Sequence, residues 1–248
     1  MGEVTEMSRH WRDSLLVDER LRAAAAELSN PKALESLRNA FTTMLHSDST
    51  AAVGIALDYY RSYEAMGRHG YDNPFEDHDD DVVRRARELL GLPPVSPSDE
   101  PMAKEFAANH ASALDGLMNL AEPEDADLLA QVLRTASTSN VRLGVALAAV
   151  CAFEDNATPS EPLIDLLGEL AADPSADYHA RSAAVSSLGV AESKRAFDAL
   201  LRVADADDES LCRQAARVIA ESAELGVAGF TPTPGKGTST SPTTKPEV

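Results

Sequence analysis

Three segments in the second half of the chain begin with an arginine and carry small residues two and three positions later. They are RLGVALAAV from Arg142, RSAAVSSLG from Arg181 and RQAARVIAE from Arg213. A shorter segment, VGIAL from Val53, matches LGVAL from Leu143, although Ala52 stands where the arginine would be. Recurring small residues at fixed positions indicate related helices whose backbones approach closely, which is typical of an internal repeat.

An amphipathic segment precedes each of these three helices. The segments are DLLAQVLRTA from Asp127, LIDLLGELA from Leu163 and AFDALLRVA from Ala196. Leu129, Ile164 and Phe197 correspond, at separations of 35 and 33 residues, which is the period of a two-helix repeat. Because one hairpin cannot bury its own apolar face, we expect successive hairpins to stack and cover one another.

The last unit shows the full pattern, with acids, an apolar residue beside an arginine, two alanines and an apolar tail. In DDESLCRQAARVIAESA the acids lie at the start of a helix, where negative charge complements unpaired backbone N-H groups. This pattern resembles the short bacterial HEAT-like repeats over roughly residues 123 to 223. The resemblance implies a ladder between neighbouring repeats, made by an Asp at the turn and an Arg six residues later. Asp207 and Arg213 keep that spacing.

Two units depart from the ladder spacing of that family. Six residues before Arg181 the chain has Ser175, with Asp173 or Asp177 as substitute acids, and six residues before Arg142 it has Ala136. We therefore expect the ladder in the last repeat alone. A degenerate repeat of this kind predicts a fold and leaves the activity open.

The whole chain is expected to be all-α, an α-solenoid of stacked two-helix HEAT-like repeats. Hydrophobic residues make up 44% of it and aromatic residues 5%, which suits closely packed helices better than β-sheets. We expect an N-terminal capping helix within residues 1–30, with the helix running from 6 to 28. The solenoid would span 31–225, with an irregular loop and linker at 67–101, and Asn30 and Pro31 would begin its first helix. Residues 226–248, rich in Thr, Ser, Pro and Gly, are predicted to be a disordered tail.

The charge balance limits the partners that this chain can bind. It has 41 acidic and 22 basic residues, a formal net charge of −19, so we expect no nucleic-acid binding. A basic protein would be attracted, although an acidic surface also serves solubility alone. No run of apolar residues is long enough to span a membrane, and the acidic N-terminus does not resemble a signal peptide, so we expect a cytoplasmic protein. Cys151 and Cys212 are expected to be buried free thiols.

The residues give little support for a catalytic, cofactor or metal site, and we expect none. Asp77, Asp79, Asp81 and Glu88 have the spacing of a calcium-binding loop, but Val82 stands where that loop requires glycine, so the acids are better read as the start of a helix. None of the six histidines is followed by glutamate, which removes the His-Glu pairs used by di-iron hydroxylases built on HEAT-like repeats.

One segment is a candidate binding surface. DYYRSYE, from Asp58 to Glu64, is rich in Tyr and Arg, the side chains that are enriched at interface hot spots. Tyr60 and Arg61 are the first choices for contact with a partner, and Asp79 and Asp80 would be their electrostatic partners. The alternative is that Tyr59 and Tyr63, four residues apart, simply pack inward while Tyr60 and Arg61 point elsewhere.

The function expected from these features is protein–protein interaction without chemistry of its own, with a partner held along a groove of the solenoid. A sharper alternative is an immunity protein that neutralises a basic toxin, which small size and acidity would suit. A second alternative is an enzyme like the phycobilin lyases, whose solenoids resemble bacterial HEAT-like repeats, although no residue here identifies a bilin site.

Overall fold

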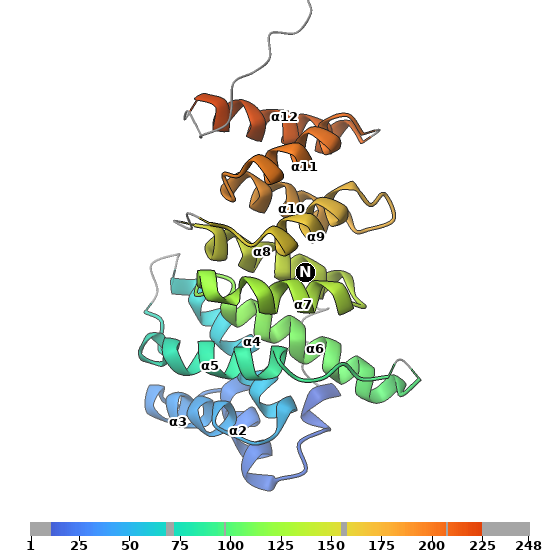
Figure 1. Cartoon of the computed structure of the whole chain (residues 1–248). Helices are drawn as coiled ribbons and strands as arrows, with labels where there is room; N and C mark the ends of the chain where they lie inside the picture. Colours follow the sequence, from blue (N-terminus) through green and yellow to red (C-terminus); the bar gives the residue numbers. More distant parts are fainter. Residues whose placement is uncertain (1–10, 68–71, 97, 155–157, 207, 225–248) are drawn as a thin grey trace, which may run out of the picture.

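Every regular element that the computed structural model describes is helical. It describes residues 11–67, 72–96, 98–154, 158–206 and 208–224. The helices follow one another along a stack, from α2 and α3 at one end to α11 and α12 at the other (Figure 1). The prediction of an all-α protein is therefore confirmed, whereas the predicted tail, 226–248, lies outside the described residues.

The described helices are α2 (Glu19–Ser29), α3 (Leu34–Leu45), α4 (Thr50–Gly67), α5 (Asp79–Leu90), α6 (Glu100–Leu117), α7 (Ala126–Thr135), α8 (Ser139–Phe153), α9 (Glu161–Ala172), α10 (Tyr178–Val190), α11 (Lys194–Ala204) and α12 (Glu209–Glu224). Two single 3-10 turns precede α5 and α7, at Glu76–His78 and Pro123–Asp125.

Neighbouring helices pack in pairs, α3 with α4, α5 with α6, α7 with α8, α9 with α10, and α11 with α12. The second helices contact one another in series, α4 to α6, α8, α10 and α12, and the first helices form a parallel series from α3 to α11. Two layers of helices result, and the apolar core lies between them. The three repeats predicted from the arginine segments are the pairs α7–α8, α9–α10 and α11–α12.

Side-chain caps fix where several helices of these pairs begin. Thr138 accepts a hydrogen bond from the Val141 amide before α8, and Ser193 accepts one from the Ala196 amide before α11. Asp177 accepts from the His179 amide at 2.9 Å before α10. Such caps satisfy backbone donors that have no partner inside the helix.

Glycines allow α6 to approach both of its neighbours in the second layer. A Cβ atom on Gly144 of α8 would lie 2.8 Å from the Leu114 Cβ of α6. On the other side, a Cβ on Gly54 of α4 would collide with the Asn109 side chain of α6. Gly54 and Gly144 are the matched glycines of VGIAL and LGVAL, so the sequence match reflects two equivalent helix contacts.

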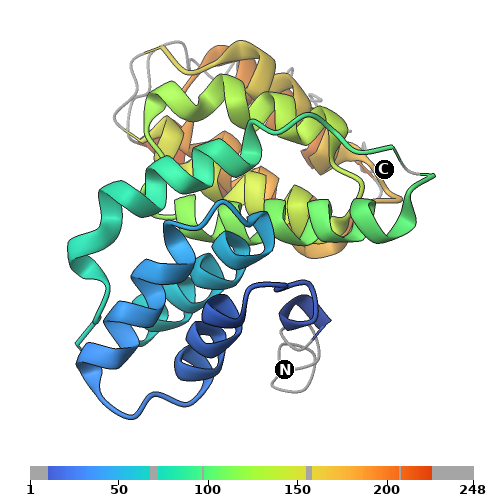
Figure 2. The same ribbon diagram turned by 90° about the horizontal axis from the view of Figure 1, so that it is seen from below.

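The N-terminal segment differs from the prediction of one helix from 6 to 28. In the described part, Trp11–Asp13 form a single helical turn, and α2 begins at Glu19. The helical path ends after Asp13, and Asp18 starts a new helix because its carboxylate accepts a hydrogen bond from the Arg20 amide and caps α2. Figure 2 shows the turn set apart from α2 and joined to it by a loop. The predicted N-cap role of Asn30 is also wrong, since Asn30 ends α2 and Ala33 precedes α3.

The prediction that the acidic segment begins a helix is confirmed, and the helix is α5. Asp79, Asp80 and Asp81 occupy the first turn of α5, where they complement its N-terminal dipole. The preceding Phe75 is fully buried and stacks on Phe41 of α3 with ring centroids 4.0 Å apart. Part of the predicted loop at 67–101 is therefore anchored to the core.

Candidate functional site

A hollow of about 760 Å³ lies on the layer of second helices. Its floor and walls come from α4, α6 and the beginning of α8, and the N-terminal turn closes one side. The charged and aromatic residues that line it are Trp11, Arg12, Asp58, Arg61, Glu100, Lys104 and Asp115. We refer to this feature as the α4–α6 hollow.

Arg12 is the most deeply buried charged residue of the α4–α6 hollow, with 2% of its surface exposed. Its guanidinium forms an ion pair with Asp58 of α4 and donates a hydrogen bond of 2.8 Å to the Ser112 hydroxyl of α6. Ser112 in turn donates to the Ala108 carbonyl, so its proton is committed to the helix. The Arg12 Nε has no hydrogen-bond partner among the described residues. The turn is thus held to two helices by one side chain.

Trp11 forms part of the rim of the same hollow. The Lys104 ammonium of α6 lies over the Trp11 ring, 4.5 Å from its centroid. This cation–π contact joins the N-terminal turn to the first half of α6. The chain has one tryptophan, so its fluorescence and its indole N-H report on this hollow alone.

Asp115 is the partly buried carboxylate of the hollow that lacks a matching donor, whereas Glu100 is exposed. None of the described residues donates a hydrogen bond to it. Burial, and then the Asp58 carboxylate, raise the pKa of Asp115 to about 6, and Arg61 and Arg12 oppose that rise. A partly buried carboxylate whose charge is disfavoured in a hollow is a candidate site for a cationic ligand.

Asp115→Asn should stabilise the protein at neutral pH. The folded-state pKa of Asp115 lies above its unfolded value, so its contribution to stability is present below about pH 4 and is lost as the pH rises through about 6. The variant should therefore exceed the wild type by about 2 kcal/mol at pH 7.5, and the gap should close near pH 4. Urea denaturation of both proteins at several pH values measures this difference.

The wild type and Asp115→Asn must be compared directly because the titration of His110 changes stability with pH in the opposite direction. Burial lowers the pKa of His110 to about 4, so its neutral form contributes stability that is lost as the pH falls from about 6.5 to 4. His110 is present in both proteins and cancels in the difference. If the two proteins have the same free energy of unfolding at pH 7.5, or if the difference between them grows as the pH falls, the role assigned to Asp115 is contradicted.

The structure separates the four residues that the sequence suggested for partner contact. Tyr60 is 3% exposed, and its hydroxyl donates a hydrogen bond of 2.7 Å to Asp79 at the start of α5. Burial and Asp79 both raise the pKa of the Tyr60 phenol. This pair joins α4 to α5 within the fold, so Tyr60 is buried inside the fold, which neither interpretation of this helix predicted. Asp80 is exposed in the first turn of α5.

Arg61 points to the other side of α4 and lines the α4–α6 hollow. Its guanidinium pairs with Glu64 at 2.7 Å, and Asn119 donates a hydrogen bond to the second oxygen of Glu64. Of the four predicted residues, Arg61 is the one that the structure places at the hollow. Its role in binding a partner stays a prediction.

The ladder between repeats is formed by a different unit from the one expected. Arg181 is 7% exposed. Its guanidinium donates a hydrogen bond of 3.0 Å to the Asp208 carboxylate of the next pair and one of 3.2 Å to the Ala171 carbonyl. Arg213 is exposed and interacts with Glu209 of its own helix. The other expected member, Asp207, lies outside the described residues. The acid of one unit thus pairs with the arginine of the preceding unit.

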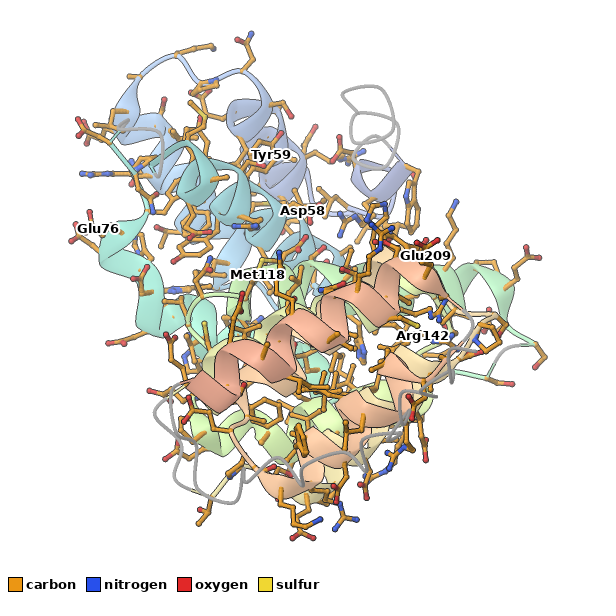
Figure 3. The ribbon with its side chains drawn as sticks, turned by 90° about the horizontal axis from the view of Figure 1, so that it is seen from above. Asp58, Tyr59, Glu76, Met118, Arg142 and Glu209 are labelled. Atoms are coloured by element: carbon orange, nitrogen blue, oxygen red, sulfur yellow. The ribbon has the colours of Figure 1, made fainter. Side chains whose placement is uncertain are left out.

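The beginnings of α8 and α12 lie on one side of the molecule. In Figure 3, Arg142 of α8 and Glu209 of α12 appear on the side opposite Glu76, which precedes α5. Arg142 is close enough to Asp173 to lower the pKa of that carboxyl, after the larger effect of hydrogen bonds from Ser175. Arg142 and Arg181 therefore occupy equivalent places in successive pairs.

The two cysteines are free, as expected, but they are partly exposed and not buried. The Cys151 thiol contacts the Met118 carbonyl and the Cys212 thiol contacts the Ala206 carbonyl, so each is held against backbone. Within the described ranges, no three His, Cys, Asp or Glu side chains are grouped so that they could hold a metal ion.

Trp11, Arg12, Lys104 and Asp115 were not singled out from the sequence. For α6 a signal exists, because Lys104, Ala108, Ala111 and Asp115 recur at helical spacing and share one face. Arg12 gives no local signal, since its partners lie 46 and 100 residues away.

Comparison of the chain with protein-family models, with curated proteins and with solved structures gave no match. No helix in the described part of the chain combines the length and the apolar composition needed to cross a membrane.

Proposed function

We propose that this protein is a non-enzymatic interaction module that binds a segment of a partner protein along its layer of second helices. The observation that supports this most directly is the α4–α6 hollow with Asp115 in it. A carboxylate that is partly buried without a donor costs free energy in the unbound protein. A partner that supplies the missing donor recovers that free energy on binding.

The shape of the surface favours an extended partner. The α4–α6 hollow spans two helices and reaches the beginning of α8, and a shallower depression follows between α10 and α12. Both depressions lie on second helices. A surface of this kind offers a chain-like ligand contacts to successive helices.

The same observations support a finer description of the fold. We propose that the paired helices form an α-solenoid of the HEAT-like kind, with the second helices on its binding side. Support comes from the two series of helix contacts, from the matched glycines Gly54 and Gly144, and from the equivalent positions of Arg142 and Arg181.

The partner is expected to be a basic protein. The chain has a formal net charge of −19, which attracts a cationic surface and accelerates encounter. The attraction should weaken as the salt concentration rises, because exposed charges are screened over about 10 Å at 0.1 M salt.

Affinity capture with three versions of the tagged protein tests the proposed function. The baits are the wild type, Ala107→Tyr and Ala172→Tyr. Ala107 lines the α4–α6 hollow, so tyrosine there fills it, whereas Ala172 is exposed at the end of α9 in the other layer and serves as the matched control. We expect the wild type and Ala172→Tyr to retain one protein in stoichiometric amount from the native lysate, and Ala107→Tyr to lose it.

Far-UV circular dichroism confirms that each bait is folded before the capture is scored. Equal retention by Ala107→Tyr would show that the hollow is not the binding surface. An eluate without a retained protein but with visible absorbance would contradict protein binding and point to a chromophore ligand.

A further inference from the structure

We propose that the α4–α6 hollow receives an arginine side chain of the partner protein, with its guanidinium against the Asp115 carboxylate. This inference rests on the proposed function, because it names the group that the partner inserts. It assigns to Asp115 the role of specificity residue on a surface that otherwise offers shape alone.

Among the partly buried charges that the structure describes in the hollow, Asp115 is the unmatched group, whereas Glu100 is exposed to solvent. Asp58 is paired with Arg12, and Arg61 is paired with Glu64. The Lys104 ammonium lies over the Trp11 ring. Each of these cations has its own neighbour, so a further cation is needed to match Asp115.

The same hollow already holds one arginine, which shows that a guanidinium fits between these helices. Arg12 is 2% exposed and reaches both Asp58 of α4 and Ser112 of α6. It enters from a segment that is not part of either helix, as a partner's side chain would. Gly54 makes room for it, since a Cβ there would lie 3.1 Å from the Arg12 Nη1.

The walls suit the aliphatic part of such a side chain. Ala103, Ala107, Ala108 and Ala111 of α6 line the hollow beside the charged groups. Long cationic side chains lie with their methylene groups on apolar surface while the charged head reaches a polar partner. Arginine fits better than lysine because its planar guanidinium binds a carboxylate with two hydrogen bonds and is more weakly hydrated.

Nuclear magnetic resonance of the full chain tests this inference with a small probe. The probe is N-acetyl-L-arginine amide, and its neutral analogue N-acetyl-L-citrulline amide is the control. At pH 7.5 Asp115 is charged, since its pKa is about 6. The indole N-H of Trp11 gives a single peak because the chain has one tryptophan. We expect this peak to shift and saturate with the arginine probe, at a millimolar dissociation constant, and to stay in place with citrulline.

The variant Asp115→Asn should weaken binding of the arginine probe about tenfold. Asp127→Asn, which removes an exposed carboxylate on α7 in the other layer, should leave it unchanged. A shift that does not saturate by about 50 mM, or that citrulline reproduces, overturns the inference. So does equal affinity of the wild type and Asp115→Asn.

Failure of this inference can be told apart from failure of the proposed function. If Ala107→Tyr abolishes capture of a partner while the arginine probe does not bind, protein binding on this surface stands and arginine recognition falls. If Ala107→Tyr changes nothing in capture, the surface itself is wrong.

Discussion

Gly144→Val is expected to lower the free energy of unfolding by about 3 kcal/mol. The new Cβ would lie 2.8 Å from the Leu114 Cβ, and a Cβ is fixed to the backbone, so α6 and α8 must separate. The Leu114 side chain is fully buried and cannot turn away into solvent. The helix propensity of valine exceeds that of glycine by a few tenths of a kcal/mol, too little to offset the clash. Urea denaturation followed by far-UV circular dichroism measures the loss.

A second substitution, at Leu114, tests whether contact with this residue causes the loss of stability in Gly144→Val. Leu114→Ala keeps the Cβ but removes the Cδ1 and Cγ atoms, which would lie 3.1 and 3.5 Å from the new Cβ, so adding Gly144→Val should cost less than it costs in the wild type. Ala216→Val, at an exposed site on α12, is the control for introducing valine into a helix and should cost below about 1 kcal/mol. Strict additivity of the two core substitutions would show that valine does not meet the Leu114 side chain beyond its Cβ.

The local parts of this fold follow from the sequence because they depend on neighbouring residues. The apolar spacing from Leu163 to Leu170 predicts a helix that buries one face, and α9 does bury it. The match of VGIAL with LGVAL predicts related helices, since a close helix approach requires a small residue at Gly54 and at Gly144. A sequence pattern with a period of a few residues therefore predicts directly where a helix buries one face and where it approaches a neighbouring helix closely.

The site depends on distant contacts, which periodicity does not encode. The chain leaves the helical path after Asp13, and Arg12 of the N-terminal turn finds partners on α4 and α6. Tyr60 was read as a surface residue because Tyr and Arg are common at interfaces, yet Asp79 gives its hydroxyl a partner inside the fold. The ladder between repeats was expected at Asp207 and Arg213 of the last unit, whereas Asp208 pairs with Arg181 of the preceding unit. In each case the deciding neighbour comes from another element.

Arg12→Ala should also cost about 3 kcal/mol of the free energy of unfolding. It leaves Asp58, whose side chain is 20% exposed, without its ion pair, and removes the hydrogen bond to Ser112. Removal of one partner of a buried ion pair is costly because the other charge stays in a poorly hydrated place. The emission of Trp11 should move to longer wavelength as the turn loosens from α6, so fluorescence and urea denaturation together measure the effect.

The matched control is Arg20→Ala, which removes an exposed arginine from α2 and should change stability by less than about 0.5 kcal/mol. Asp58→Ala and the double variant complete a cycle for the pair. Because either single substitution leaves one charge unmatched, the double variant should be more stable than the sum of the two losses predicts. If the losses simply add, the pair does not hold the turn, and the Arg12 side chain contributes through packing between α4 and α6. In that case the Trp11 emission should still shift in Arg12→Ala and stay unchanged in Asp58→Ala, which separates the two explanations.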